Sequence, residues 1–280
     1  MEKWYPGFKF DVFRPTLGQA FIIIIALMVS RIIFGAFINA IERYADIALN
    51  GTLMDGFAMI FIFGFIFLFA VQFRWRQIPE VYSVKRFKSI NFIPIVCSVA
   101  GLSILVSELD NGIRHLIPMS KYHSAIHASK VISDAGWGGS LFTIAIVAPI
   151  TYELFFRGWL LKSFLNKYPL GSAVAYSLLL FALLEGNPWQ FTDIILLGTL
   201  VSIWFIRFKS VIPCIIGHSI YNLMPVLFFS ILKIDVPGYS SNLEARGYQP
   251  LWFDLIGLGL MTVSGILFYA FNRQKKNPIE

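Results

Sequence analysis

The sequence predicts an all-α membrane protein in which about eight transmembrane helices form one bundle and one domain over residues 1–280. Hydrophobic residues make up 57% of the chain and charged residues 14%, and the mean hydropathy is +0.69, which no ordinary soluble domain of this length approaches. No segment alternates inward and outward side chains as the strand of a membrane β-barrel does. Helices must therefore satisfy the backbone hydrogen bonds within the lipid.

Polar loops separate the apolar runs that predict these helices. In chain order the runs cover residues 17–38, 54–73, 90–106, 140–165, 170–184, 191–208, 211–232 and 251–271. Residues 1–16 mix aromatic and basic side chains, which is typical of an interfacial segment and not of a cleavable signal. Arg31 lies toward the far end of the first run. For its side chain we favour snorkelling to the headgroups over pairing with a buried acid.

The basic residues indicate how the helices are oriented. The net charge is +7, but Lys and Arg lie beside the apolar runs and form no basic amphipathic face, so we expect no nucleic-acid partner. They dominate both termini and the second, fourth and sixth loops, and Lys162 and Lys167 mark the exit of the fourth run. Both termini are therefore predicted to face the cytoplasm.

The cysteines and most histidines predict no metal site. Cys97 and Cys214 each lie inside an apolar run, where a buried thiol is expected and not a disulfide or a metal ligand. His123 and His127 are one helical turn apart. Without an interposed Glu or a third ligand nearby, this spacing indicates a helix at the membrane surface, and we leave the pair out of the candidate site.

Three half-polar clusters within the apolar sequence form the candidate functional site. They occupy residues 148–158, 181–189 and 217–222. An ionisable side chain in a bilayer costs about 2.5–3.5 kcal/mol on insertion scales, so a group of such clusters suggests a working site.

Helical spacing predicts which side chains of these clusters lie together. Glu153 and Arg157 are four residues apart, so they share a face and can pair, with the acid in the favourable N-terminal position. His218 and Asn222 share a face in the same way. Tyr152 is rotated by about 100° from Glu153. If Tyr152 faces a cavity, the Glu153–Arg157 pair faces a neighbouring helix and is structural.

The order and spacing of the clusters resemble the CAAX prenyl protease and bacteriocin-processing family of intramembrane proteases, also called the Abi family. Its signature is Glu-Glu-x-x-x-Arg, Phe-x-x-x-His and His-x-x-x-Asn. The matching residues are Ala148-Pro149-Ile150, Phe156-Arg157-Gly158, Phe181-Ala182-Leu183-Leu184, Asn187-Pro188-Trp189, and His218 with Asn222. They cover about 139–232, and the other helices match only as apolar spans. The resemblance implies a peptidase that acts on membrane-associated or lipidated peptides in a prokaryotic cytoplasmic membrane.

Two positions depart from the family signature. Tyr152 stands where the first Glu belongs, and Glu185 stands where the second motif has His. In the family, the first Glu activates the attacking water, the two His residues orient that water or bind metal, and the Asn helps to hold the oxyanion. Tyrosine, with a reference pKa near 10, is a poor general base at neutral pH. The retained positions are Glu153, Arg157, His218 and Asn222.

Three hypotheses follow from these departures. In the first, the site is rewired: Glu185 activates the water, Tyr152 donates a hydrogen bond to the oxyanion, and His218 carries the proton. In the second, the chain is a non-catalytic pseudoprotease that binds a hydrophobic or lipidated peptide or another membrane protein, for example in bacteriocin immunity. In the third, these polar residues lie on the ion path of a transporter. The specific flanking matches rank the transporter last.

We expect no bound metal and no other cofactor. The motif positions offer His218, Glu185 and Asn222, and therefore one imidazole, whereas catalytic zinc commonly takes three protein ligands rich in His. Glu185 ends its apolar run, while Tyr152 lies near the middle of another. For the two to meet, the run 170–184 must be tilted, displaced or re-entrant; otherwise Glu185 is a loop acid beside the membrane.

Overall fold

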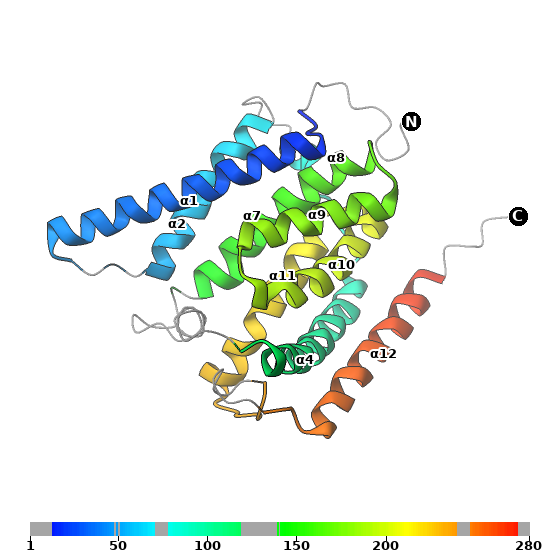
Figure 1. Cartoon of the computed structure of the whole chain (residues 1–280). Helices are drawn as coiled ribbons and strands as arrows, with labels where there is room; N and C mark the ends of the chain where they lie inside the picture. Colours follow the sequence, from blue (N-terminus) through cyan, green and yellow to red (C-terminus); the bar gives the residue numbers. More distant parts are fainter. Residues whose placement is uncertain are drawn as a thin grey trace, which may run out of the picture.

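The computed structural model of the chain is built from helices (Figure 1). It describes residues 13–47, 49, 51–70, 78–118, 139, 141–239 and 247–273, and every regular element within these ranges is helical. The predicted all-α fold class is therefore confirmed. The pair His123 and His127 lies outside the described residues, as do residues 1–12 of the predicted interfacial segment and the chain after residue 273.

The long helices follow the eight predicted runs. They are α1 (Leu17–Ala45), α2 (Gly51–Ala70), α4 (Phe92–Leu116), a continuous fourth helix made of η3 (Leu141–Val147), α7 (Ala148–Glu153), η4 (Leu154–Leu161) and α8 (Lys162–Leu165), then α9 (Leu170–Glu185), α10 (Phe191–Phe208), α11 (Ile212–Val226) with η6 (Leu227–Ile231), and α12 (Leu251–Arg273). The short turns are α3 (Ile78–Val81), η2 (Ser89–Asn91) and η5 (Pro188–Gln190). In the part of the chain that the structure describes, six helical stretches are long and apolar enough to cross a membrane, and α9 is a shorter apolar helix. The chain is thus a polytopic integral membrane protein.

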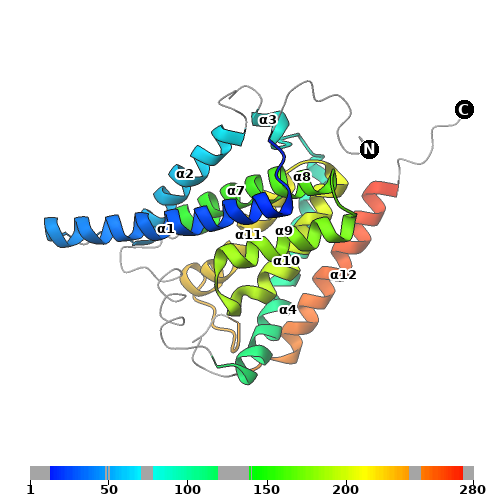
Figure 2. The same ribbon diagram turned by 45° about the horizontal axis from the view of Figure 1, so that its top comes forward.

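Helix α1 runs beyond its predicted end. Thr16 and Gln19 form a capping box at its start, where the Gln19 side chain accepts from the Thr16 amide at 2.9 Å. At the other end the helix continues to Ala45, because polar residues such as Glu42 and Arg43 stay helical after the apolar run has stopped. Figure 2 shows this second half of α1 projecting away from the other helices. The apolar run therefore predicted where the helix crosses the membrane but not that it continues to Ala45.

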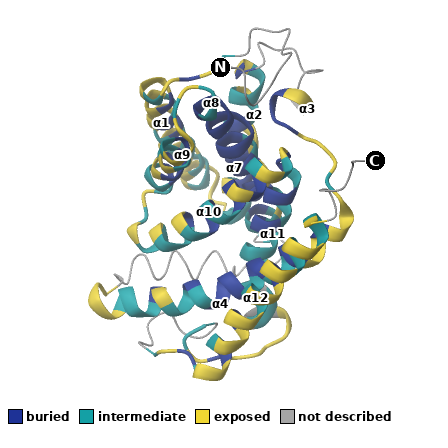
Figure 3. Ribbon diagram, turned by 90° about the vertical axis from the view of Figure 1, so that its right-hand side faces the viewer, coloured by how far each residue is buried: buried dark blue, intermediate teal, exposed yellow. Residues whose placement is uncertain are grey.

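Burial separates the lipid-facing helices from the core. In Figure 3 buried residues gather on α7, α8 and α11, and exposed residues run along α1 and α12. The exposed positions are largely apolar, for example Ile32, Phe61 and Leu251. Apolar side chains on the outside of a transmembrane bundle face lipid tails, so this distribution fits a membrane environment.

Small residues allow the closest helix crossing. A Cβ added to Gly101 of α4 would lie 2.6 Å from the carbonyl oxygen of Gly257 on α12, so neither helix tolerates a side chain there. Ser264 of α12 also donates a hydrogen bond to the Pro94 carbonyl at 2.7 Å. Close backbone approach and hydroxyl hydrogen bonds hold membrane helices together where the hydrophobic effect contributes little.

The fourth helix widens on both sides of the first polar cluster. η3 and η4 are π-helical, and α7 lies between them. Pro149 near the start of α7 lacks an amide proton and so cannot continue the regular hydrogen-bond ladder. Thr151 donates its hydroxyl to the Val147 carbonyl at 2.8 Å. Single π-helical turns are frequent at functional sites, and here they flank Tyr152 and Glu153.

Lys162 lies in the last turn of the fourth helix, at the predicted exit, and is buried there. Only 8% of the residue is exposed, and Nζ donates to the carbonyls of Glu80 and Val81 and to the hydroxyl of Ser83. These bonds hold residues 80–83, at the end of α3 and just after it, against the fourth helix. Beside them, Tyr82 donates its hydroxyl to the Phe67 carbonyl at 3.0 Å, and burial raises the pKa of this phenol. Lys162 is therefore a structural anchor.

Helix α9 stops at Glu185 because the next residue adopts a left-handed conformation. Gly186 has φ of 62°, which glycine adopts without strain, and its amide donates to the Ala182 carbonyl at 3.0 Å. Asn187 then accepts from the Trp189 amide at 3.1 Å, and α10 begins two residues later. The chain reverses directly after Glu185, so this carboxylate sits at the tip of a tight turn between two helices.

Candidate active site

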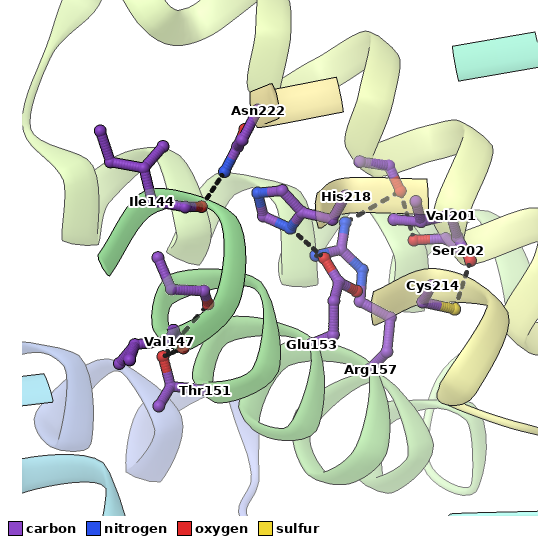
Figure 4. A network of polar contacts seen from close by, with 12 residues as sticks. Ile144, Val147, Thr151, Glu153, Arg157, Val201, Ser202, Cys214, His218 and Asn222 are labelled. Atoms are coloured by element: carbon purple, nitrogen blue, oxygen red, sulfur yellow. Dashed lines mark hydrogen bonds and ion pairs between the residues drawn. The ribbon is translucent and has the colours of Figure 1, made fainter. Parts of the chain in front are cut away.

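Glu153 is the centre of a hydrogen-bonded group of three side chains from two helices (Figure 4). It is fully buried, and its Oε1 lies 3.1 Å from Arg157 Nη1 and 2.7 Å from His218 Nδ1. The ion pair predicted from the four-residue spacing is therefore confirmed. A carboxylate paired with arginine is ionised and can only accept, so His218 Nδ1 must carry a proton and donate it.

The charge balance of this group favours a neutral His218. One arginine already neutralises the Glu153 carboxylate, and a second cation would leave an unpaired charge in a buried place. In the neutral ring with the proton on Nδ1, Nε2 keeps a lone pair. Figure 4 shows this second ring nitrogen on the side that faces Asn222. His218 thus offers a basic nitrogen while a carboxylate fixes the orientation of its ring.

Arg157 is held from three sides. Besides the bond to Glu153, Nη2 donates to the Gly198 carbonyl at 3.0 Å, and the guanidinium lies over the ring of Phe181 at 5.6 Å. A Cβ added to Gly198 would lie 2.9 Å from Nη2 and 2.4 Å from Leu178 Cδ2. A glycine in α10 is therefore needed for the backbone to come this close. These contacts fix the cation, which in turn fixes Glu153.

Helix α11 positions its polar side chains toward different neighbours. His218 reaches Glu153 on α7, whereas Asn222, one turn later, donates Nδ2 to the Ile144 carbonyl at 2.9 Å on η3. The Cys214 thiol donates to the Val201 carbonyl at 3.2 Å on α10. A Cβ on Gly217 would lie 2.3 Å from the Trp204 ring, so α11 also packs closely here. The shared face predicted for His218 and Asn222 thus contacts the fourth helix at two points.

Tyr152 lies beside the Glu153 group but does not join its hydrogen bonds. The residue is 5% exposed, and its ring stacks on the imidazole of His218 with centroids 6.5 Å apart and planes 28° apart. Phe63 and Phe181 meet the same ring edge to face at 5.7 and 5.2 Å. The Tyr152 ring is therefore fixed by aromatic contacts, with its plane nearly parallel to that of the candidate base.

A second polar group surrounds the Tyr152 hydroxyl. The phenol interacts electrostatically with Glu185 of α9 and Arg31 of α1, and Arg31 interacts in addition with Asp55 of α2. These interactions favour the alternative to snorkelling, in which Arg31 pairs with buried acids. Glu185 is not an isolated loop acid, since the end of α9 reaches Tyr152. Within the described ranges Glu185 makes no hydrogen bond to His218, and its Oε1 is buried without a hydrogen-bond partner.

The predicted site residues thus fall into two adjoining groups. Glu153, Arg157 and His218 are hydrogen-bonded together, with Asn222 bound to the backbone one turn away. Tyr152 and Glu185, the two positions that depart from the family signature, lie together in the second group. The sequence did not predict Arg31 as a member of this group, although a cation inside an apolar run gave a signal. It gave none for Asp55 or Gly198.

The first group does not offer the ligand set of a catalytic metal. Among the residues that the structure describes, no three or more His, Cys, Asp and Glu side chains are placed to hold a metal ion. Glu153 and His218 are only two such donors, and Arg157 is bound to the carboxylate oxygen that His218 also uses. Catalytic zinc takes three protein ligands. The chemistry proposed below therefore uses side chains alone.

Comparison with known proteins shows what the segment around this site is similar to. Residues 135–224 match the family model described as type II CAAX prenyl endopeptidase Rce1-like. Over 90 residues the chain is 34% identical to UPF0177 protein YbdI from Lactococcus lactis subsp. lactis (strain IL1403), an alignment that covers 32% of this chain and 48% of the relative. The chain thus matches about half the length of that relative. No solved structure matches the chain.

The matched segment contains all six predicted site residues. It also contains every other member of the two polar groups apart from Arg31 and Asp55. The resemblance inferred from the three motifs is therefore confirmed for this segment: residues 135–224 are similar to the Rce1-like CAAX prenyl endopeptidase family. Arg31 and Asp55 lie on α1 and α2, before the matched segment.

Proposed function

We propose that this membrane protein, whose residues 135–224 are similar to the Rce1-like family, is a peptidase with an altered catalytic centre that cleaves membrane-associated or lipidated peptides. The observation that carries the proposal is the 2.7 Å contact between Glu153 Oε1 and His218 Nδ1. A buried carboxylate that orients an imidazole and leaves its other nitrogen free is an arrangement that activates a nucleophile in many hydrolases.

In this mechanism His218 is the general base. Nε2 takes a proton from a water molecule, and the oxygen of that water adds to the carbonyl carbon of the scissile peptide bond. The imidazolium then returns the proton to the departing amine nitrogen as the carbon–nitrogen bond breaks. Glu153 stabilises the transient imidazolium, and Arg157 keeps Glu153 in place as a positioning residue. Contributions of this kind accelerate reactions by about 10²–10⁴-fold.

Tyr152 and Glu185 receive different roles from those expected of the motif positions. The Tyr152 ring stacks on His218, so its hydroxyl is suited to donate a hydrogen bond to the oxyanion that forms on the carbonyl oxygen. Asn222 Nδ2 donates one of its two N–H groups to Ile144, which leaves the second for the same oxyanion. Glu185, which interacts with Tyr152 and not with His218, acts as a positioning residue for the phenol.

A second candidate function is favoured by the substitution itself. Tyr152 stands where the family has its water-activating acid, and Arg157 neutralises the neighbouring Glu153. A protein with the same fold and no hydrolysis would bind a hydrophobic or lipidated peptide or a membrane protein as a pseudoprotease. Under either function the protein is expected in a prokaryotic cytoplasmic membrane, with both termini in the cytoplasm.

A cleavage assay in lipid bilayers tests the proposal. The full chain is reconstituted in proteoliposomes with a farnesylated peptide, the same peptide without lipid, and a transmembrane model peptide, and products are read by mass spectrometry. We expect the parent to cleave at least one of them and His218→Ala to lose about 10²–10⁴-fold of the rate. His115→Ala, which removes an imidazole outside the site, is the matched control and should cleave like the parent.

Two outcomes would decide against the peptidase. If His218→Ala cleaves as fast as the parent, the assigned base is wrong. If the parent cleaves none of the three peptides while the double variant Tyr152→Glu, Glu185→His does, the family fold is intact and only the substituted positions prevent hydrolysis. The non-catalytic function then replaces the proposed one.

A further inference from the structure

A third polar group lies where α4 ends and α10 begins, outside the candidate active site. Asp110 and Arg114 belong to the last turns of α4, Asp193 to the first turn of α10, and Tyr221 to α11. The three helices pack against one another, and Figure 1 shows α10 and α11 above α4. The proposed reaction uses none of these side chains.

Two of the contacts in this group are direct. The Tyr221 hydroxyl donates a hydrogen bond to Asp193 Oδ1. Arg114 Nη2 lies 4.0 Å from Asp110 Oδ2, and only 9% of the Asp110 side chain is exposed. The other oxygen of Asp110, Oδ1, is buried and has no hydrogen-bond donor among the described residues. An unsatisfied buried carboxylate oxygen is costly, so this atom requires a partner.

One partner of Asp110 is another carboxylate. Asp110 and Asp193 interact both electrostatically and through their side-chain oxygens, while Arg114 faces both acids. Two ionised carboxylates and one guanidinium leave a net charge of −1 in a low-dielectric place, and like charges in contact cannot both ionise there. A single proton between the carboxylates removes that charge and supplies the donor that Asp110 Oδ1 lacks.

We propose that Asp110 and Asp193 form a proton-binding site in which one proton is shared between the two carboxylates. Tyr221 orients Asp193 by its hydrogen bond, and Arg114 balances the remaining negative charge. The ligand is a proton and not a metal cation, because the guanidinium already occupies the cationic position beside Asp110. The inference is independent of the proposed peptidase activity.

Other polar and titratable groups lie on the neighbouring elements. Thr192 of α10 faces Asp110, and Tyr239 of the loop before α12 faces Tyr221. On the side of α4 toward α12, Glu108 interacts with Asp254 and accepts from the Gln249 amide at 2.9 Å. The shared proton therefore joins α4 to α10, and through Tyr221 to α11, the helix that carries His218 one turn earlier.

Infrared spectroscopy of the purified full chain in lipid nanodiscs tests the site. A carboxyl group that carries a proton has a C=O stretch distinct from the bands of a carboxylate. We expect the parent at neutral pH to show such a band, and both Asp110→Asn and Asp193→Asn to lose it, because the remaining acid ionises beside Arg114 or Tyr221. Tyr221→Phe should shift the band by removing the hydrogen bond to Asp193. The matched control is Asp254→Asn, which leaves the band unchanged.

Several outcomes overturn the inference. If the parent shows no band that depends on these residues, no proton is bound; if only one of the two variants loses the band, one acid holds the proton alone. If exchanging potassium for sodium in the buffer abolishes the band, the site takes a cation. Thermal unfolding of each variant is measured alongside, and the spectra count only for variants that retain a cooperative transition.

Discussion

The two polar groups at the candidate site differ in how firmly they are built. Glu153, Arg157 and His218 are tied by hydrogen bonds of 3.1 and 2.7 Å, and each of them is at least nine-tenths buried. Tyr152 interacts with Glu185 and with Arg31 through charge and side-chain hydrogen bonding, but Glu185 Oε1 is buried without a hydrogen-bond partner among the described residues. The firm group consists of retained family positions, and the loose group contains both substituted ones.

This difference suggests what the substitutions have changed. The family signature has an acid on the fourth helix and an imidazole on the fifth, whereas here the carboxylate of Glu185 lies on the fifth helix beside the phenol of Tyr152. Arg31 of α1 provides a cation near this carboxylate. The group around Glu153 instead has its contacts with α10 and α11.

The largest expected effect comes from breaking the firm group. Arg157→Met leaves the Glu153 carboxylate without its counter-charge in a fully buried place, and loss of one partner of such a pair costs about 3–5 kcal/mol. We expect a markedly lower thermal midpoint in detergent micelles. The double variant Glu153→Gln, Arg157→Met removes both charges and should recover much of the loss. An unchanged midpoint in the single variant would show that the pair is not structural.

The next effect separates chemistry from stability in the loose group. Tyr152→Phe removes one hydroxyl and keeps the ring contacts with His218 and Phe181, so the thermal midpoint should stay near that of the parent. If the phenol stabilises the oxyanion, kcat falls by about 10²–10³-fold, as when one such donor is removed. The measurement is peptide cleavage at saturating substrate. Unchanged turnover would remove Tyr152 from the mechanism.

A smaller effect tests the backbone contact that holds Arg157. Gly198→Ala places a Cβ 2.9 Å from Arg157 Nη2 and 2.4 Å from Leu178, and overpacking of this kind costs about 1–3 kcal/mol. Thermal unfolding should show a moderate drop. The matched control is Gly64→Ala on α2, where a Cβ meets nothing within 4 Å. Equal thermal midpoints for the two variants would contradict the close approach of α10 to Arg157.

The smallest effect is expected at Arg31. Its side chain is only half-buried, and it interacts with Tyr152 and with the acids mainly through charge, so Arg31→Gln should change the unfolding free energy by about 1 kcal/mol. The comparison with Arg157→Met, measured by the same thermal unfolding, sharpens the contrast between the groups. A loss as large as that of Arg157→Met would mean that the second group is as firm as the first.

The sequence predicted the helices and the firm group well, for physical reasons. Long apolar runs locate membrane helices because the bilayer fixes their length, and a spacing of four fixes Glu153 beside Arg157. Neither run length nor residue spacing determines which helices lie close together. Nothing in the order of residues indicated that His218 would reach Glu153 and not Glu185, or that α9 would end level with Tyr152.

Lone charges were the least predictable from sequence. For Arg31 and Lys162 the sequence indicated a place near a membrane boundary but not their partners, which are acids on other helices for Arg31 and carbonyls after α3 for Lys162. Partners of a cation that lie on other elements leave no periodic pattern in the chain. The sequence still indicated that such a charge needs a partner, because placing an unpaired charge inside an apolar run is costly.

The most direct test of the account is the protonation state of His218 in the folded protein. Nitrogen-15 NMR of histidine-labelled protein in nanodiscs, with His218→Ala to assign the signal, reports which ring nitrogen carries the proton. We predict a neutral ring protonated at Nδ1, with a hydrogen-bonded Nδ1 proton whose signal moves in Glu153→Gln. A ring protonated at Nε2, or a signal that Glu153→Gln leaves unchanged, would contradict the assignment of His218 as the base.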